Sequence, residues 1–178
     1  MMEKEYKKAV FGAGCFWCSE AAFSMLKGIV EVRPGYAGGK TVDPTYETVS
    51  AGSTGHIEVA EVTYDPNIRS YGDLLAVFFS IHDPTSVDRQ GQDVGPQYRS
   101  VIFHMDEDQE REAQEVIDGL KSDGLPIVTE LRPLDIFYPA EDYHREYYEK
   151  HKDVPYCVAV IEPKLKKMRE KFSDIIKE

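Results

Sequence analysis

Segments with the spacing of β-strands and segments with the spacing of amphipathic helices are mixed along the whole chain, and this most constrains the fold. Strands are predicted at residues 8–11, 29–33, 56–64, 98–104 and 127–131. Helices are predicted at residues 16–26, 70–81, 106–120, 139–151 and 163–176. Such mixing is typical of an α/β or α+β domain. No linker divides the chain, so we predict one domain over residues 1–178, with 152–178 packing as a tail plus helix.

Two long loops, at residues 34–55 and 82–97, are punctuated by glycine and proline. Loops of this length without regular structure are uncommon in a small domain, and they are usually functional or disordered. We therefore expect them to contribute to a functional site.

The charge balance excludes several classes of partner. The 178 residues include 21 Lys and Arg against 32 Asp and Glu, a formal net charge of −11. Non-specific nucleic-acid binding and docking on anionic membranes both need a basic surface.

The first ten residues lack an apolar run, and no stretch approaches the length of a membrane span. We expect a soluble, cytoplasmic protein, and its three cysteines do not predict a structural disulfide framework there.

The motif GAGCFWC, residues 12–18, carries the most specific chemistry. Its glycines predict a tight strand-to-helix turn that puts Cys15 at a helix N-terminus, where backbone N–H groups lower a thiol pKa. Cys18 follows one turn later, and a Cys-X-X-Cys pair at a helix start can open and close a disulfide. The alternatives are two buried core thiols or a zinc site. Zinc needs four ligands, and only Cys157 and five histidines remain to supply them.

Phe16 and Trp17 lie between the two cysteines, and Trp17 is the only tryptophan of the chain. In most helices such residues belong to the core. Beside a reactive thiol they can instead form an apolar pocket for a methyl or thioether group.

The motif resembles the active-site motif of the peptide methionine sulfoxide reductases of the A class. Three further blocks resemble that family in the same order: residues 35–66, the sequence HDPTSVDRQGQDVGPQYRS at 82–100, and FYPAEDYH at 137–144. Together they cover most of the first 145 residues. We expect an α+β fold, a two-layer α/β sandwich with a ferredoxin-like plait of mixed strands and flanking helices.

The resemblance implies a reaction. The Cys15 thiolate would attack the sulfur of the S epimer of methionine sulfoxide, free or in proteins, leaving methionine and a sulfenic acid. A second cysteine would condense with the sulfenic acid to a disulfide, which thioredoxin would reduce. We expect a monomer that needs no cofactor and no metal.

A sulfoxide oxygen leaves only when it is protonated, so the site needs an acid. The resemblance assigns this role to Glu58, and burial among aromatic residues would raise its pKa enough to keep it protonated. Glu61 is expected on a solvated face, and His56 is expected to be a structural, hydrogen-bonded histidine. By the same resemblance, Tyr46 and Tyr98 would donate hydrogen bonds to the sulfoxide oxygen. Asp93 would orient the site, and Phe16 and Trp17 would form the apolar pocket for the methyl group.

The chain departs from the family pattern at Cys18, where many members carry glycine or another small residue. Those members regenerate the nucleophile through cysteines in a glycine-rich tail. Here the tail holds one cysteine, Cys157, followed by an amphipathic helix. Two routes follow, and we expect Cys18 to resolve Cys15 because the loop-closure cost is low, although a helical frame strains such a bridge. Alternatively, Cys157 moves in or acts as a second relay, or is simply a small buried residue.

Two other functions compete with the reductase. A thioredoxin-like disulfide oxidoreductase would use Cys15 and Cys18 but would not need Glu58, Tyr46 or Tyr98. A non-catalytic zinc module would need further ligands. Turnover of methionine sulfoxide separates the reductase from both.

Overall fold

A six-stranded sheet forms the centre of the computed structural model, which describes residues 3–178. The strand order is β7-β6-β1-β3-β2-β8. All neighbours are antiparallel except β6 and β7, which are parallel. The strands are β1 (Lys7–Ala13), β2 (Ile29–Ala37), β3 (Ile57–Tyr64), β6 (Ser100–His104), β7 (Glu130–Pro133) and β8 (Phe137–Pro139).

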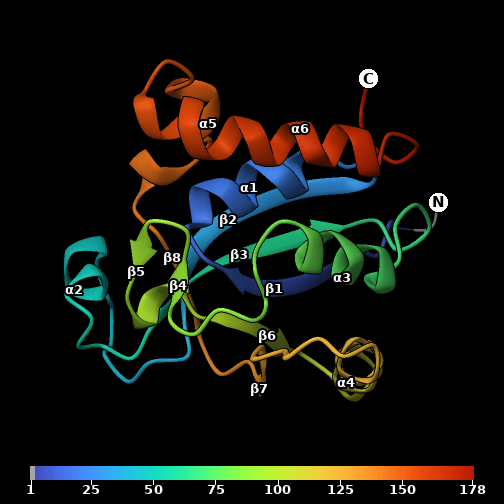
Figure 1. The fold of residues 1–178 in the computed structure, drawn as a ribbon, viewed down its shortest axis with the longest axis horizontal. Coiled ribbons are helices and arrows are strands. Elements are labelled where there is room, and N and C mark those ends of the chain that lie inside the picture. Colours follow the sequence, from blue (N-terminus) through green and yellow to red (C-terminus); the bar gives the residue numbers. More distant parts are fainter. Residues whose placement is uncertain (1–2) are drawn as a thin grey trace.

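Three of the four longer helices, α1 (Phe16–Ser24), α3 (Tyr71–Ser80) and α4 (Glu107–Ser122), pack against a single face of this sheet, and the fourth, α6 (Glu162–Lys171), packs on α1 (Figure 1). The expectation of an α+β fold with a mixed sheet and flanking helices is therefore confirmed at this level.

Alternation along β1 explains why the helices lie on one face. Phe11 points to the helices and stacks on Phe23 of α1 at 5.3 Å and on Phe78 of α3 at 5.1 Å between ring centroids. Truncating a buried phenylalanine to alanine typically costs about 3–5 kcal/mol, so this contact fixes both helices on the sheet. Val10 points the other way, into a smaller cluster against which Leu134 and Phe137 pack.

The predicted helix over residues 139–151 is wrong. The chain there forms a short 3₁₀ turn, Asp142–His144, and one helical turn, α5 (Tyr147–Lys150). Glu146 between them has φ +54° and ψ +35°, a left-handed conformation that interrupts any continuous helix. Its N–H donates to the carboxylate of Glu20 on α1, a tertiary contact that replaces a helical hydrogen bond.

Several other boundaries also differ from the predictions. The two predicted loops contain regular structure: the end of β2, a short helix α2 (Tyr46–Ser50), and a hairpin of β4 (Arg89–Gln90) and β5 (Asp93–Val94). The last predicted strand, 127–131, is shifted to β7, and β8 was not predicted. The final helix begins as a π-helical turn, Cys157–Ile161, and ends at Lys171 instead of residue 176.

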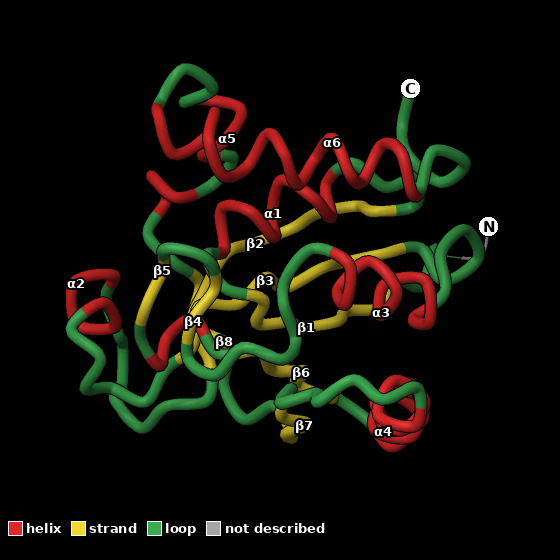
Figure 2. The backbone as a smooth tube through the Cα atoms, viewed as in Figure 1, coloured by secondary structure: helices red, strands yellow, loops and turns green. Residues whose placement is uncertain are grey.

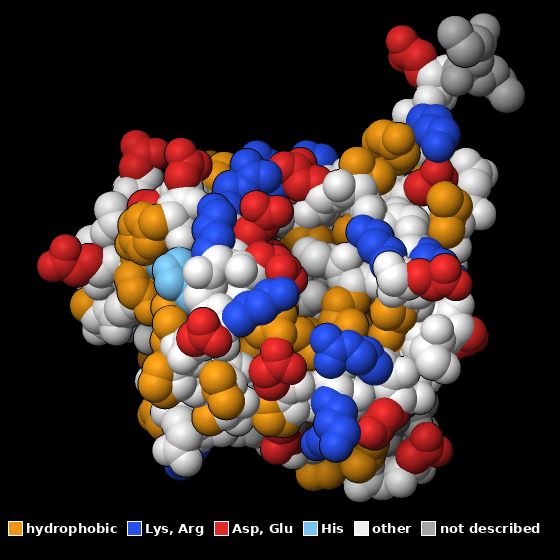
Figure 3. All heavy atoms as spheres, turned by 90° about the horizontal axis from the view of Figure 1, so that it is seen from above, with side chains coloured by type: hydrophobic (Ala, Val, Ile, Leu, Met, Phe, Trp, Pro, Cys, Tyr) orange, Lys and Arg blue, Asp and Glu red, His pale blue; other side chains and the backbone are white. Residues whose placement is uncertain are grey.

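The loop that carries α2 and the β4–β5 hairpin gather at the end of the sheet where β1 leads into α1 (Figure 2). The segment with α5 reaches the same end, above α1. Seen from the α6 side, acidic and basic side chains are interspersed over the surface (Figure 3). Across residues 3–178, every helix falls short of the length and apolar character that a membrane crossing requires.

Candidate active site

Cys15 lies at the turn between β1 and α1, as the sequence predicts. Gly14 supplies the turn with φ +85°, and Cys15 is the N-cap residue of α1. The Cys15 carbonyl accepts the N–H of Cys18 at 3.2 Å, which puts the second cysteine one turn further along the helix. Both cysteines are buried, and neither forms a disulfide.

Glu58 extends from β3 toward the start of α1. Its Oε1 accepts the backbone N–H of Phe16 at 3.2 Å, and its Oε2 is buried without a hydrogen-bond partner among the described residues. The side chain is 1% exposed. Burial raises the pKa of this carboxyl to about 8, although the Phe16 N–H partly opposes the shift. Glu58 is thus largely protonated at neutral pH, with one oxygen free for a ligand.

The two thiols influence each other, and the expected lowering of the Cys15 pKa is wrong for the unliganded site. Burial raises the pKa of Cys15, and the neighbouring charges of Cys18 and Glu58 raise it further. A hydrogen bond from Cys15 lowers the pKa of Cys18 to about 7. The N–H of Phe16, the first residue of α1, is donated to Glu58. The two buried thiols therefore titrate as a coupled pair.

Tyr46 and Tyr98 come from separate loops and face the same carboxyl and thiol. Tyr46 begins α2, and Tyr98 ends a 3₁₀ turn, Pro96–Tyr98. Burial raises the pKa of Tyr46 to about 12, and the charges of Glu58 and Cys15 add to this. The same three influences raise the pKa of Tyr98, together with the charge of Asp93. Both phenols are therefore protonated donors close to Glu58 and Cys15.

Asp93, on the β4–β5 hairpin, accepts a hydrogen bond from Tyr156, a residue that sequence reasoning missed. Tyr156 Oη donates to Asp93 Oδ2 at 2.6 Å and lies 3.8 Å from Cys18 Sγ. Its neighbour in the chain is Cys157, which was the one available sequence signal. A cavity of about 480 Å³ opens beside this pair, between the hairpin and α6.

Aromatic rings surround the start of α1. Phe16 is fully buried, with ring centroids 4.9 Å from His144 and 5.7 Å from Tyr36. Trp17 is half-buried and stacks on Tyr147 at 3.8 Å with 7° between the ring planes. Trp17 Nε1 donates to His144 Nδ1 at 3.0 Å. Tyr36, His144 and Tyr147 were not predicted as site residues, because nothing local in the sequence links them to Trp17.

Two polar residues singled out from the sequence have different outcomes. His56 is hydrogen-bonded on both ring nitrogens, to the Gly39 N–H at 3.0 Å and the Thr41 carbonyl at 2.7 Å, which confirms a structural role. Glu61 was expected in solvent and is instead 5% exposed. It lies on the opposite face of β3 from Glu58 and accepts two hydrogen bonds from Arg33, at 2.8 and 3.0 Å.

Cys157 is fully buried on the π-helical turn that precedes α6. Burial raises the pKa of its thiol, and the charge of Cys18 is the next cause. This turn packs on α1, the helix that carries Cys18. The three cysteines of the chain thus gather at one end of α1.

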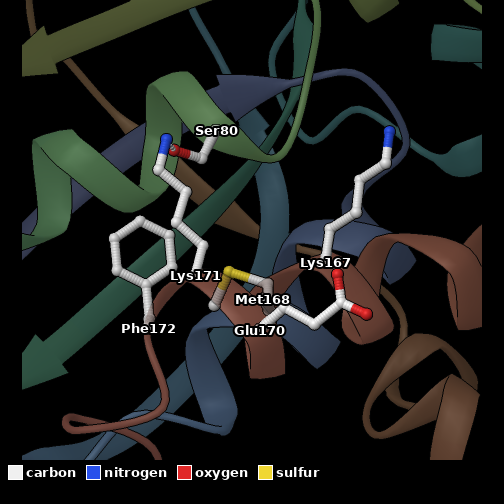
Figure 4. A pocket seen from close by; sticks show the side chains of 6 residues that line it. All are labelled: Ser80, Lys167, Met168, Glu170, Lys171 and Phe172. Carbon is white, nitrogen blue, oxygen red and sulfur yellow. Dashed lines mark hydrogen bonds between the residues drawn. The ribbon is translucent and has the colours of Figure 1, made fainter.

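A separate cavity of about 430 Å³ lies between the end of α3 and α6 (Figure 4). Lys171 crosses it to donate to Ser80 Oγ at 2.9 Å. Its lining contains none of the predicted site residues: it consists of Ser80, Lys167, Met168, Glu170, Lys171 and Phe172.

Known proteins have similar sequences and folds. A protein from Sulfolobus acidocaldarius described as peptide methionine sulfoxide reductase MsrA is 52% identical over 167 residues, 93% of this chain and 95% of that protein. The crystal structure of reduced Mxr1 from Saccharomyces cerevisiae superposes with a TM-score of 0.81 and 33% identity, covering 86% of this chain and 90% of that chain.

Mxr1 has also been solved in complex with Trx2. That structure superposes with a TM-score of 0.58 and 24% identity, over 83% of this chain and 90% of that chain. The family model described as peptide methionine sulfoxide reductase matches residues 7–176. With nearly the whole chain matched by that model, the protein belongs to the peptide methionine sulfoxide reductase family.

Proposed function

We propose that the chain reduces the S epimer of methionine sulfoxide, free or in proteins, to methionine, with Cys15 as nucleophile and Glu58 as acid. The observation that carries this assignment is the free Oε2 of Glu58. It is a buried carboxyl oxygen without a partner among the described residues, on a group whose pKa is about 8, beside the Cys15 turn. Sulfoxide reduction needs a proton donor at this place, because the sulfoxide oxygen leaves only when it is protonated.

In the first step the Cys15 sulfur attacks the sulfoxide sulfur as a thiolate. Glu58 gives its proton to the sulfoxide oxygen, and the Tyr46 and Tyr98 hydroxyls donate hydrogen bonds to it. The oxygen is transferred to Cys15, so the sulfoxide is reduced to a thioether and the thiol is oxidised to a sulfenic acid. The Cys15 proton passes to the Cys18 sulfur, because the two thiols are hydrogen-bonded to each other.

Phe16 and Trp17 are proposed to receive the substrate methyl group, with Asp93 orienting the site through its hydrogen bond from Tyr156. The ring of Phe16 is buried and that of Trp17 is half-buried, so together they offer an apolar wall beside a reactive sulfur. Removing the methyl group from water favours the bound state at roughly 0.8 kcal/mol per buried carbon.

For regeneration, we propose that Cys18 resolves Cys15. Cys18, whose thiol pKa is about 7, attacks the sulfenic sulfur, and the Cys15 hydroxyl leaves as water with the proton that the Cys18 thiol gives up. Cys157 then attacks Cys18, which frees Cys15 and leaves a Cys18–Cys157 disulfide. Thioredoxin is the proposed reductant, in line with the complex of the yeast relative with Trx2. Direct resolution by Cys157 is the alternative route.

We further propose that residues 1–178 act as one catalytic, monomeric domain, with 152–178 as a tail plus helix that supplies Tyr156 and Cys157. A ferredoxin-like plait is the proposed fold class. The element order β1-α1-β2-β3-α3-β6, with strand order β6-β1-β3-β2, supports it because this is a βαββαβ arrangement.

A single-turnover experiment tests the function. Reduced protein is mixed with racemic methionine sulfoxide without added reductant, and methionine is counted per chain in wild type, Cys15→Ser, Cys18→Ser and Cys157→Ser. We expect only Cys15→Ser to abolish the first turnover and only the S epimer to be consumed. If the wild type forms no methionine, the reductase assignment is rejected in favour of a thioredoxin-like disulfide oxidoreductase.

Mapping the disulfide by mass spectrometry in the same samples tests the regeneration route. A Cys15–Cys18 bridge trapped in Cys157→Ser supports resolution by Cys18. A Cys15–Cys157 bridge as the first product in wild type would assign resolution to the tail cysteine.

A further inference from the structure

A second buried carboxylate, Glu20, lies near the site and has no part in the chemistry above. It is on α1, three residues after Trp17, and is 4% exposed. Residues three apart on a helix share a face, so Glu20 and Trp17 point toward the same neighbouring segment. A buried carboxylate is costly unless it is hydrogen-bonded, and the partners of Glu20 therefore indicate what it does.

Those partners are backbone groups of the segment that carries His144 and Tyr147. Glu20 Oε2 accepts the N–H of Glu146 at 3.0 Å, and the N–H of Tyr147 also donates to this carboxylate. Glu146, in its left-handed conformation, precedes α5 and makes no side-chain cap of its own. Glu20 thus serves as a cap for α5 from another helix, and it stabilises a backbone conformation that a non-glycine residue rarely adopts.

The segment held by Glu20 builds two contacts to Trp17. Tyr147 stacks on the indole at 3.8 Å, and His144 accepts the indole N–H at 3.0 Å. His144 also lies against Phe16, at 4.9 Å between ring centroids. Both rings proposed to receive the substrate methyl group are therefore buttressed by a segment whose backbone is tied to Glu20.

We propose that Glu20 is a positioning residue that sets the shape of the methyl-binding wall by fixing the segment 144–147 against Trp17. This inference rests on the proposed function for the identity of the ligand. The positioning of Trp17 does not rest on the proposed function, because the contacts of segment 144–147 with Trp17 exist without substrate. Glu20 acts through Trp17 and Phe16 and does not touch the reacting atoms.

The second tie on this segment offers a matched control. Arg145 donates to Glu31 of β2 at 2.7 Å, and both side chains are roughly half exposed, at 46% and 45%. Exposed pairs of this kind contribute little to stability. Glu31→Gln therefore removes a carboxylate that also holds the segment, while leaving the buried tie intact.

The test compares Glu20→Ala, Glu20→Gln and Glu31→Gln with wild type. Trp17 is the only tryptophan of the chain, so intrinsic fluorescence reports directly on its surroundings. In Glu20→Ala we expect a red-shifted emission, stronger quenching by acrylamide and a KM for S-methionine sulfoxide raised about tenfold, with kcat changed less. Glu20→Gln keeps one acceptor oxygen and should recover most of both effects. Glu31→Gln should match wild type in both readouts.

Unchanged emission and unchanged KM in a folded Glu20→Ala would overturn the proposal, as would a loss confined to kcat. If Glu20→Ala fails to fold, Glu20→Leu decides, because it removes both acceptor oxygens and keeps most of the buried volume. A red-shifted emission together with a raised KM in Glu20→Leu supports positioning, and wild-type values of both overturn it. Wild type that makes no methionine would reject the proposed function, whereas a fluorescence shift in Glu20→Ala would still stand by itself.

Discussion

The backbone N–H of Phe16 donates to Glu58 Oε1 at 3.2 Å, so the first N–H of α1 serves the proposed acid instead of the nucleophile. This bond fixes Glu58 beside Cys15, the residue that precedes Phe16. It also leaves Oε2 of Glu58 as the oxygen that meets a ligand. The helix start therefore aligns acid and nucleophile, while burial keeps the acid protonated.

Replacing Glu58 by glutamine tests this arrangement. The amide oxygen still accepts the Phe16 N–H, but the side chain no longer provides an acidic proton. We expect the single-turnover rate of sulfoxide reduction to fall about 10²–10⁴-fold. Alkylation of the cysteines by iodoacetamide should remain within a few fold of wild type. Glu61→Gln, on the opposite face of β3, is the control. If sulfoxide reduction and cysteine alkylation slow equally in Glu58→Gln, the assignment of Glu58 as the acid is contradicted.

The pH dependence of that rate follows from two groups. The thiol pair gains its negative charge near pH 7, where Cys18 titrates, so the rate should rise up to there. The pKa of Glu58 is raised to about 8, so its protonated form dominates below that pH and is lost above it. We therefore expect a bell-shaped profile with its falling limb near pH 8 in single-turnover rates. Glu58→Gln should lose the falling limb, and a limb that persists there would assign it to another group.

The sequence predicted the core of the fold because the core elements are locally consistent. Helix α1 and strands β1 and β3 are mainly apolar segments with glycine or proline near their ends. The segment 139–151 has helical spacing too, yet it breaks at Glu146. Its conformation depends on Glu20, more than a hundred residues earlier in the chain. No local pattern can contain such a contact.

The same reasoning separates the predicted and missed site residues. Cys15, Phe16, Trp17 and Cys18 occupy one continuous motif, and Glu58 lies on a strand with clear alternation. Tyr156 and His144 reach the site only through hydrogen bonds across the fold, to Asp93 and Trp17 respectively. The raised pKa of Cys15 was also not predicted, because it depends on burial in the folded chain and on the charges of Cys18 and Glu58.

Gly14 is expected to be essential for the position of Cys15. Its φ of +85° disfavours any side chain, and a Cβ there would lie 2.8 Å from Gln90 Cγ. Gly91 has φ +58° with no atom within 4 Å, so Gly91→Ala measures the backbone strain alone. Gly91→Ala should cost about 1–3 kcal/mol in urea unfolding, and Gly14→Ala should cost more and slow the first turnover. Equal stability losses and a wild-type rate in Gly14→Ala would show that the turn tolerates a side chain.

His82 should make the protein unstable toward acid. Its Nδ1 donates to the Phe78 carbonyl at 2.6 Å, and its Nε2 lies 2.7 Å from Ser100 Oγ, which can donate to it when the ring is neutral. Burial lowers its pKa to about 4, from an ordinary value near 6.5.

Between those two values the unfolded chain binds more protons than the folded chain, so the free energy of unfolding falls as the pH falls. The difference of roughly 2.5 pKa units corresponds to about 3 kcal/mol, lost between pH 6.5 and pH 4. Urea unfolding at pH 7, 5.5 and 4.5 measures it. His82→Gln should be less stable at pH 7 but should depend less on pH. His104→Gln, at a half-buried histidine at the end of β6, should keep the wild-type slope. A slope in His82→Gln as steep as that of wild type would mean that other groups cause the acid sensitivity.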